Sequence, residues 1–196
     1  MLRRFLLLAV LLTACAERPL SQVRGEVHGR TGGPGTVAVL DPDGQRLTSA
    51  PLDRVGRFTL PLPEAAALDG VLRPSVAPAL PGCTSQITAS VPAARYWVQD
   101  RLTAFPTGGP ASGVPLISED RSSGQTTQRL IHRMYVYASA ATRVTGQSSC
   151  PAAPTTRYQM DLKAGWNTVA AQQTRGSDTV LISVGDDGFE RWSVAP

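Results

Sequence analysis

The side chains that could do acid–base or nucleophilic chemistry are few and scattered. The chain of 196 residues has two histidines, His28 and His132, and neither has a carboxylate or a nucleophile at motif spacing. A Gly-x-Ser-x-Gly nucleophile elbow is missing, because Ser112 in Gly-Pro-Ala-Ser-Gly has the wrong offset. Neither a His-Glu-x-x-His motif nor a glycine-rich phosphate loop occurs. We therefore expect no catalytic residue and no cofactor, and we interpret His132 as a core histidine.

Two aspartate-rich segments, 41–44 and 186–188, could offer oxygen ligands to Ca²⁺. Calcium takes six to eight oxygens, and an EF-hand loop adds a third acid and a distant glutamate. Those additional acids are missing here. Asp and Gly are also the residues that a tight turn requires, so we expect two turns and no metal site.

The best candidates for ligand binding are arginine and aromatic side chains on two expected strands. Alternation places the members of each strand on one face, and on the first strand Gln99 lies between Trp97 and Arg101. These residues are Arg95, Trp97, Arg101, Arg133, Tyr135 and Tyr137. If the two strands adjoin, their rings could stack a sugar or a peptide. The alternative is that both faces are buried in a sandwich, which makes these residues part of the core and its rim.

The chain begins with two arginines, Arg3 and Arg4, then an apolar run over 5–12 that is too short to span a bilayer, then Leu-Thr-Ala-Cys15. This start resembles a bacterial lipoprotein signal peptide that ends in a lipobox. The resemblance implies a signal helix over 1–14, lipidation of Cys15, and a tether over 15–21. It also implies an extracytoplasmic protein held to the bacterial membrane by its acyl chains. The alternative is an ordinary cleaved signal beside a chance cysteine.

An extracytoplasmic location makes a disulfide the expected state of the other two cysteines. Once Cys15 is set aside, Cys83 and Cys150 remain, and outside the cytoplasm such a pair most simply forms one disulfide. Such a bond would connect the middle of the chain to its latter half, which favours a single domain over 22–196. The alternative is two free or metal-binding thiols, although no other cysteine or histidine lies close to either in the sequence.

The net charge of +4 gives no reason to expect a nucleic-acid partner. Two of these positive charges belong to Arg3 and Arg4 and would be lost with the signal peptide. The remaining arginines are scattered singly, so the chain has no basic run.

Two-residue alternation with turn signals about every ten residues predicts an all-β fold, a sandwich or partly open barrel of short antiparallel strands. Around Arg129–Met134 a short helix is the alternative to a strand. The last two strands are expected to form a hairpin, and Pro106–Pro115 a flexible loop. The expected strands are 22–28, 36–40, 45–52, 57–62, 87–91, 95–105, 128–141, 157–162, 166–170, 179–184 and 189–194.

The first of these strands carry a second resemblance. Val-x-Gly-x-Val, then Val-Ala-Val-Leu-Asp-Pro-Asp-Gly, then Leu-Asp-x-x-Gly-Arg-Phe-Thr-Leu-Pro-Leu-Pro together resemble the carboxypeptidase-regulatory-like, transthyretin-like β-sandwich module. The match covers 22–63, and the usual closing strand is replaced by a short helical segment at 64–70. A subdivision into 22–63 and 71–196 follows from this resemblance. Such modules mostly serve as structural or binding domains.

We therefore expect a lipid-anchored envelope protein whose domain is a non-catalytic structural or ligand-binding β-sandwich. Its partners would be the membrane and a sugar, a peptide or another envelope protein. The alternative is an envelope hydrolase whose site assembles in space around His132 and a serine.

Overall fold

The computed structural model describes residues 20–28, 34–77, 81–123, 128–151, 153–174, 177–185 and 190–195. The expected signal peptide, Cys15 and the aspartate-rich turn at 186–188 lie outside these residues. Within them the chain is nearly all β, with fourteen strands in one large mixed sheet that does not close. The prediction of a sandwich or partly open barrel is confirmed.

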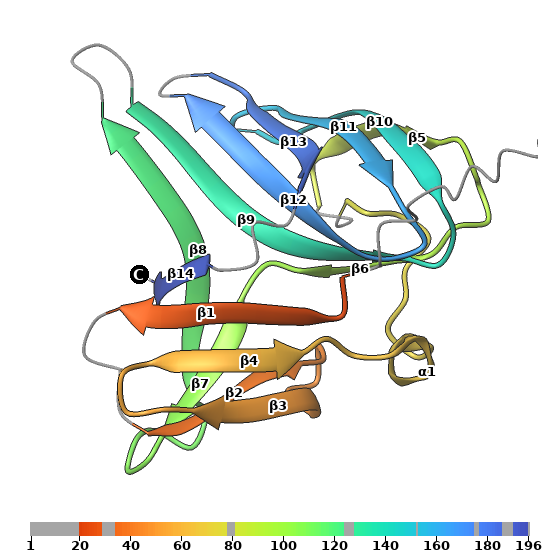
Figure 1. Cartoon of the computed structure of the whole chain (residues 1–196). Helices are drawn as coiled ribbons and strands as arrows, with labels where there is room; N and C mark the ends of the chain where they lie inside the picture. Colours follow the sequence, from red (N-terminus) through yellow and green to blue (C-terminus); the bar gives the residue numbers. More distant parts are fainter. Residues whose placement is uncertain are drawn as a thin grey trace, which may run out of the picture.

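The sheet has two halves, which lie one above the other in Figure 1. Strands of the lower half run in the order β4-β1-β14-β8-β7-β2-β3. The two outermost strands of this half meet at one turn, where Asp53 N donates to Arg57 O at 3.0 Å. The bounds are β1 (Gln22–His28), β2 (Gly35–Leu40), β3 (Arg46–Leu52), β4 (Arg57–Pro61), β7 (Leu102–Pro106), β8 (Val114–Ser123) and β14 (Glu190–Val194).

The upper half curls around a second set of apolar side chains. Its strand order is β9-β12-β13-β11-β10-β5, and the other edge of β9 is shared by β6 and the second part of β8. The bounds are β5 (Thr84–Ala89), β6 (Tyr96–Gln99), β9 (Gln128–Ala138), β10 (Thr142–Ser149), β11 (Thr156–Leu162), β12 (Gly165–Thr174) and β13 (Thr179–Val184).

Strand β8 joins the two halves. Its first residues pair with β7 and β14, and from Ser118 onward it pairs with β9. Figure 1 shows it rising from the lower half into the upper one. Sequence alternation did not predict β8, because Pro115 stands near its start and polar residues fill its second part. Its buried residues Leu116 and Ser118 nevertheless alternate as in any strand.

The first four strands match their predicted ranges within one residue at each end. Val23, Gly25 and Val27 are buried on one face of β1, as are Phe58 and Leu60 on β4. The helix expected after β4 is the single turn α1 (Ala65–Leu68). Within the described part of the chain, no helix is long and apolar enough to cross a membrane.

The segment 41–44 is a turn, as expected. The Oδ1 atom of Asp41 accepts hydrogen bonds from the backbone N–H groups of Asp43 and Gln45, at 2.9 and 2.7 Å. The turn before β4 repeats this arrangement with the carboxylate of Asp53. Gly44 has a φ of +81°, a backbone conformation that glycine adopts without steric cost. The Asp41 carboxylate therefore serves the backbone.

Two hydrophobic clusters fill the two halves, and β9 borders both. Tyr135 is buried in the lower cluster, against which Tyr137 packs, whereas Val136 and Ala138 are buried in the upper cluster. The expected inward residues of β11, Tyr158, Met160 and Leu162, are also in the upper cluster. The strand prediction for 128–141 is thus confirmed over Gln128–Ala138.

The predicted closing hairpin is wrong. Strand β13 pairs with β11 and β12 in the upper half, whereas β14 lies parallel to β1 and antiparallel to β8 in the lower half. The reason is the burial of Trp192, which is 1% exposed. Its ring lies 6.2 Å from the ring centroids of Tyr135 and Phe58. Burying an indole in the lower core stabilises more than a short hairpin between two half-exposed strands would.

The expected strand 95–105 is two strands, because the chain passes there from the upper half to the lower. Strand β6 ends at Gln99 and β7 begins at Leu102. Strand β10 was not predicted, because in its sequence Thr-Arg-Val-Thr-Gly-Gln-Ser-Ser only Val144 is a large apolar residue. Its pairing with β11 and β5, rather than its own composition, fixes it as a strand.

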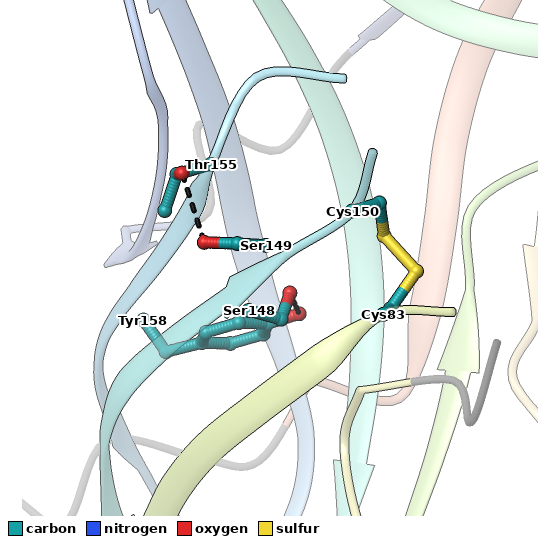
Figure 2. Close-up of a disulfide and its surroundings, with 6 residues drawn as sticks. All are labelled: Cys83, Ser148, Ser149, Cys150, Thr155 and Tyr158. Carbon is teal, nitrogen blue, oxygen red and sulfur yellow. Dashed lines mark hydrogen bonds between the residues drawn. A yellow bond between two sulfur atoms is a disulfide. The ribbon is translucent and has the colours of Figure 1, made fainter. Parts of the chain in front are cut away.

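Cys83 and Cys150 form the expected disulfide, with an S–S bond of 2.10 Å across 67 positions of sequence. Cys83 directly precedes β5 and Cys150 directly follows β10, so the bond closes one end of this antiparallel pair (Figure 2). Beside it, Ser149 Oγ and Thr155 Oγ1 lie 3.0 Å apart. The alternative of two free thiols is excluded for this structure.

A methyl group at Gly25 should destabilise the fold. A Cβ there would lie 2.6 Å from the Trp192 ring and 2.7 Å from the Glu190 carbonyl oxygen. We expect Gly25→Ala to lower the free energy of unfolding by about 1–3 kcal/mol through overpacking. Gly70→Ala is the matched control, since a Cβ at Gly70 meets nothing within 4 Å. Urea titrations of both variants test this, and equal stability would contradict the close packing of β1 on β14.

Removal of the disulfide should lower stability because it increases the conformational entropy of the unfolded chain. We expect the double variant Cys83→Ser/Cys150→Ser to lose about 4 kcal/mol of unfolding free energy in the chain-entropy account. The comparison is made with the unchanged protein, folded with and without reductant. A midpoint of unfolding that neither reduction nor the double substitution moves would contradict the bond.

Candidate functional site

Four ionisable side chains lie where the two halves of the sheet meet, as two pairs on opposite faces of β9. Glu119 on β8 stands opposite His132 on β9. The next residue of β9, Arg133, forms an ion pair with Glu190, the first residue of β14. Because β8, β9 and β14 all converge here, this junction is the best candidate for a site that the fold assembles.

In the Arg133–Glu190 pair, Glu190 is the more deeply buried residue. Arg133 Nη1 lies 3.9 Å from Glu190 Oε1, and the two side chains are 23% and 3% exposed. A carboxylate so withdrawn from water needs a compensating charge, because desolvation of an ion costs several kcal/mol. The pair links the upper half to the lower half, so its first role is to hold the junction together.

His132 does not complete a catalytic arrangement with the described residues. Its Nδ1 atom is buried without a hydrogen-bond partner. The nearest serine on β8, Ser118, pairs with Arg133, and strand alternation turns it to the opposite face from His132. Glu119 is its cross-strand neighbour, but it forms no hydrogen bond with His132 Nδ1. This geometry gives no support to a hydrolase site around His132.

The two candidate aromatic strands adjoin as expected, because Trp97 stands opposite Tyr137 in the pairing of β6 with β9. Their rings nevertheless form no exposed platform. Trp97 is 9% and Tyr135 is 2% exposed, and Tyr137 packs edge-to-face on Trp166 at 5.6 Å between centroids. These rings therefore offer no stacking surface to a ligand. The core alternative is found instead, because β9 is covered on both faces.

The three candidate arginines have separate surroundings. Arg95 is exposed at the start of β6. Arg101 pairs with its neighbour Asp100 at 3.2 Å, with both side chains about half exposed. Arg133 belongs to the buried pair with Glu190. The three arginines therefore do not lie in one common site.

A shallow depression of about 460 Å³ lies at the ends of β5, β10 and β11. Arg143 Nε and Asp161 Oδ1 meet in it at 2.6 Å, both well exposed. The hydrogen bond and the charge of Asp161 raise the pKa of Arg143 above its ordinary value. The lining residues are Ser90, Ala141, Thr142, Arg143, Asp161 and Leu162.

The hydroxyl groups of this depression hold the strands in place. Ser90 Oγ accepts from Arg143 N at 2.9 Å, and Thr142 Oγ1 accepts from Val91 N at 3.2 Å. Sequence reasoning missed the depression because only the pairing of β10 with β11 brings Arg143 and Asp161 together. No group of three or more metal-ligating side chains occurs among the described residues.

The buried pair predicts an asymmetry between two arginine substitutions. Arg133→Met leaves the Glu190 carboxylate buried without this counter-charge, so we expect a loss of about 3 kcal/mol in unfolding free energy. Arg101→Met is the control, since its partner is exposed and such pairs contribute less than about 1 kcal/mol. Adding Glu190→Gln to Arg133→Met should recover part of the loss. Equal losses at Arg133 and Arg101 in urea titrations would contradict a structural role for the pair.

The resemblance of residues 22–63 to the carboxypeptidase-regulatory-like module stays a prediction. Comparison with protein-family models, curated proteins and solved structures finds no match for this chain.

Proposed function

We propose that this protein is a lipid-anchored component of the bacterial cell envelope whose β domain is a structural or ligand-binding module without catalysis. The observation that carries the proposal is the Cys83–Cys150 disulfide. Stable disulfides belong mainly to proteins that fold outside the cytoplasm. The chain has three cysteines, and the bond accounts for two of them, so Cys15 is the one that remains.

The start of the described chain supports attachment close to the membrane. Leu20 forms a β-bridge with Trp166 and packs against the lower core. Ser21 O accepts a hydrogen bond from Leu62 N at 2.9 Å. Five residue steps separate Cys15 from Leu20, and a fully extended chain covers them in at most about 18 Å. A lipid on Cys15 would therefore hold the domain within that distance of the bilayer surface.

The polar groups of the described residues favour a structural or binding role. The carboxylates of Asp41 and Asp53 bind turn backbone, Glu190 pairs with Arg133, and the hydroxyls of Ser90 and Thr142 bind strand backbone. Each of these groups is thus committed to the fold. A partner such as a peptide, a sugar or another envelope protein would then meet the outer surface of the sheet. We expect no nucleic-acid partner, because the arginines after Arg4 are scattered singly along the sequence.

Radiolabelled palmitate tests the attachment directly. In a bacterial host we expect the full chain to incorporate the label and to sediment with membranes, and Cys15→Ala to do neither. Cys83→Ser/Cys150→Ser is the matched control, because it removes two thiols and should keep the label. An ordinary cleaved signal predicts an unlabelled, released protein, and that result would overturn the lipid anchor.

A further inference from the structure

Strand β5 is the end of the upper half of the sheet. Among the described residues it pairs with β10 alone, and Figure 1 shows it as the last strand of that half. In an antiparallel pair, alternate residues turn their N–H and C=O groups away from the partner. The outer edge of β5 therefore presents backbone donors and acceptors that no described strand binds.

This edge lacks the usual protection against pairing with another chain. Natural edge strands carry charged residues, proline or bulges that block such contacts. Strand β5 reads Thr-Ser-Gln-Ile-Thr-Ala and has none of these residues. The outermost strands of the lower half differ: β3 contains Arg46 and Pro51, and β4 contains Arg57 and Pro61. Of the three outermost strands β3, β4 and β5, only β5 thus has a bare edge.

The edge is also held in an extended conformation before any partner arrives. The disulfide fixes its first end to β10. In its middle, Gly146 of β10 lies so close that a Cβ there would overlap the backbone of Gln86. Thr88 and Thr145 add a side-chain contact of 3.2 Å between the same two strands. A rigid edge loses little entropy when another strand pairs with it.

We propose that β5 pairs with β5 of a second copy of this chain, antiparallel and about a two-fold axis. Such an isologous contact needs a surface that complements itself. An antiparallel strand meets that condition, because each copy offers the other the same outward N–H and C=O groups. Without charges on β5, the two copies bring no like charges together. Six residues a side make a small interface, so the dimer is of the weak, reversible class.

Placing lysines on this edge tests the proposal. Ser85 and Gln86 are exposed, and the variant Ser85→Lys/Gln86→Lys should weaken dimerisation of the full-length protein in detergent about tenfold, measured by sedimentation equilibrium. The control is Ser49→Lys/Gln159→Lys, which makes the same substitutions at exposed positions of β3 and β11. Circular dichroism should show equal folding of both variants.

A photo-cross-linking amino acid identifies the partner in intact cells. Placed at Gln86, it should give a product of twice the mass of the chain that contains only peptides of this protein. Placed at Gln159 on an inner strand, it should not. A purely monomeric wild type, equal dimerisation of both lysine variants, or a product at Gln86 that contains a different protein would each overturn the second copy as the occupant.

Discussion

The fold depends on a strand that is covered on both faces. Along β9, Tyr135 contributes to the lower core while its neighbour Val136 contributes to the upper core. Both hydrophobic clusters must therefore form around one backbone, and β8, β6 and β12 all pair with it. The apparent division of β9 into an apolar face and an aromatic–arginine face is a division between two cores. The aromatic residues that were the best binding candidates in the sequence, such as Trp97 and Tyr135, are therefore buried in the core.

Local chemistry made the first four strands predictable. Alternation at Val23, Gly25 and Val27 and the Asp–Gly turns before β3 and β4 act within a few residues, so their outcome is visible in the sequence. The disulfide was predictable for a different reason, because the pairing of two remaining cysteines leaves one connectivity. In both cases the prediction needed no knowledge of distant contacts.

The features that the sequence did not predict depend on contacts between residues far apart in the chain. Strand β8 has Pro115 and a polar second part, yet it joins the halves because β14 and β9 offer it hydrogen bonds on successive stretches. The predicted hairpin of β13 and β14 failed because burial of Trp192 beside Gly25 outweighs the pairing of neighbours. The Arg133–Glu190 pair joins positions 57 residues apart, so no local pattern could signal it. For the same reason the sequence left open whether the aromatic side chains are exposed or buried, since exposure is a property of the assembled sheet.

Several polar side chains of this protein bind its own turns and strands, whereas the outer edge of β5 keeps backbone groups available to a partner. The Asp41 carboxylate satisfies a turn, Ser90 and Thr142 join strand ends, and Trp97 donates its indole N–H to Gln99. Of the outermost strands β3, β4 and β5, only β5 carries no charged side chain, and no described strand pairs with its outer edge. Recognition by an edge reads strand direction and hydrogen-bond spacing more than side-chain identity. The proposed lipid anchor would favour such association, because a weak contact between copies held at one membrane gains from high local concentration.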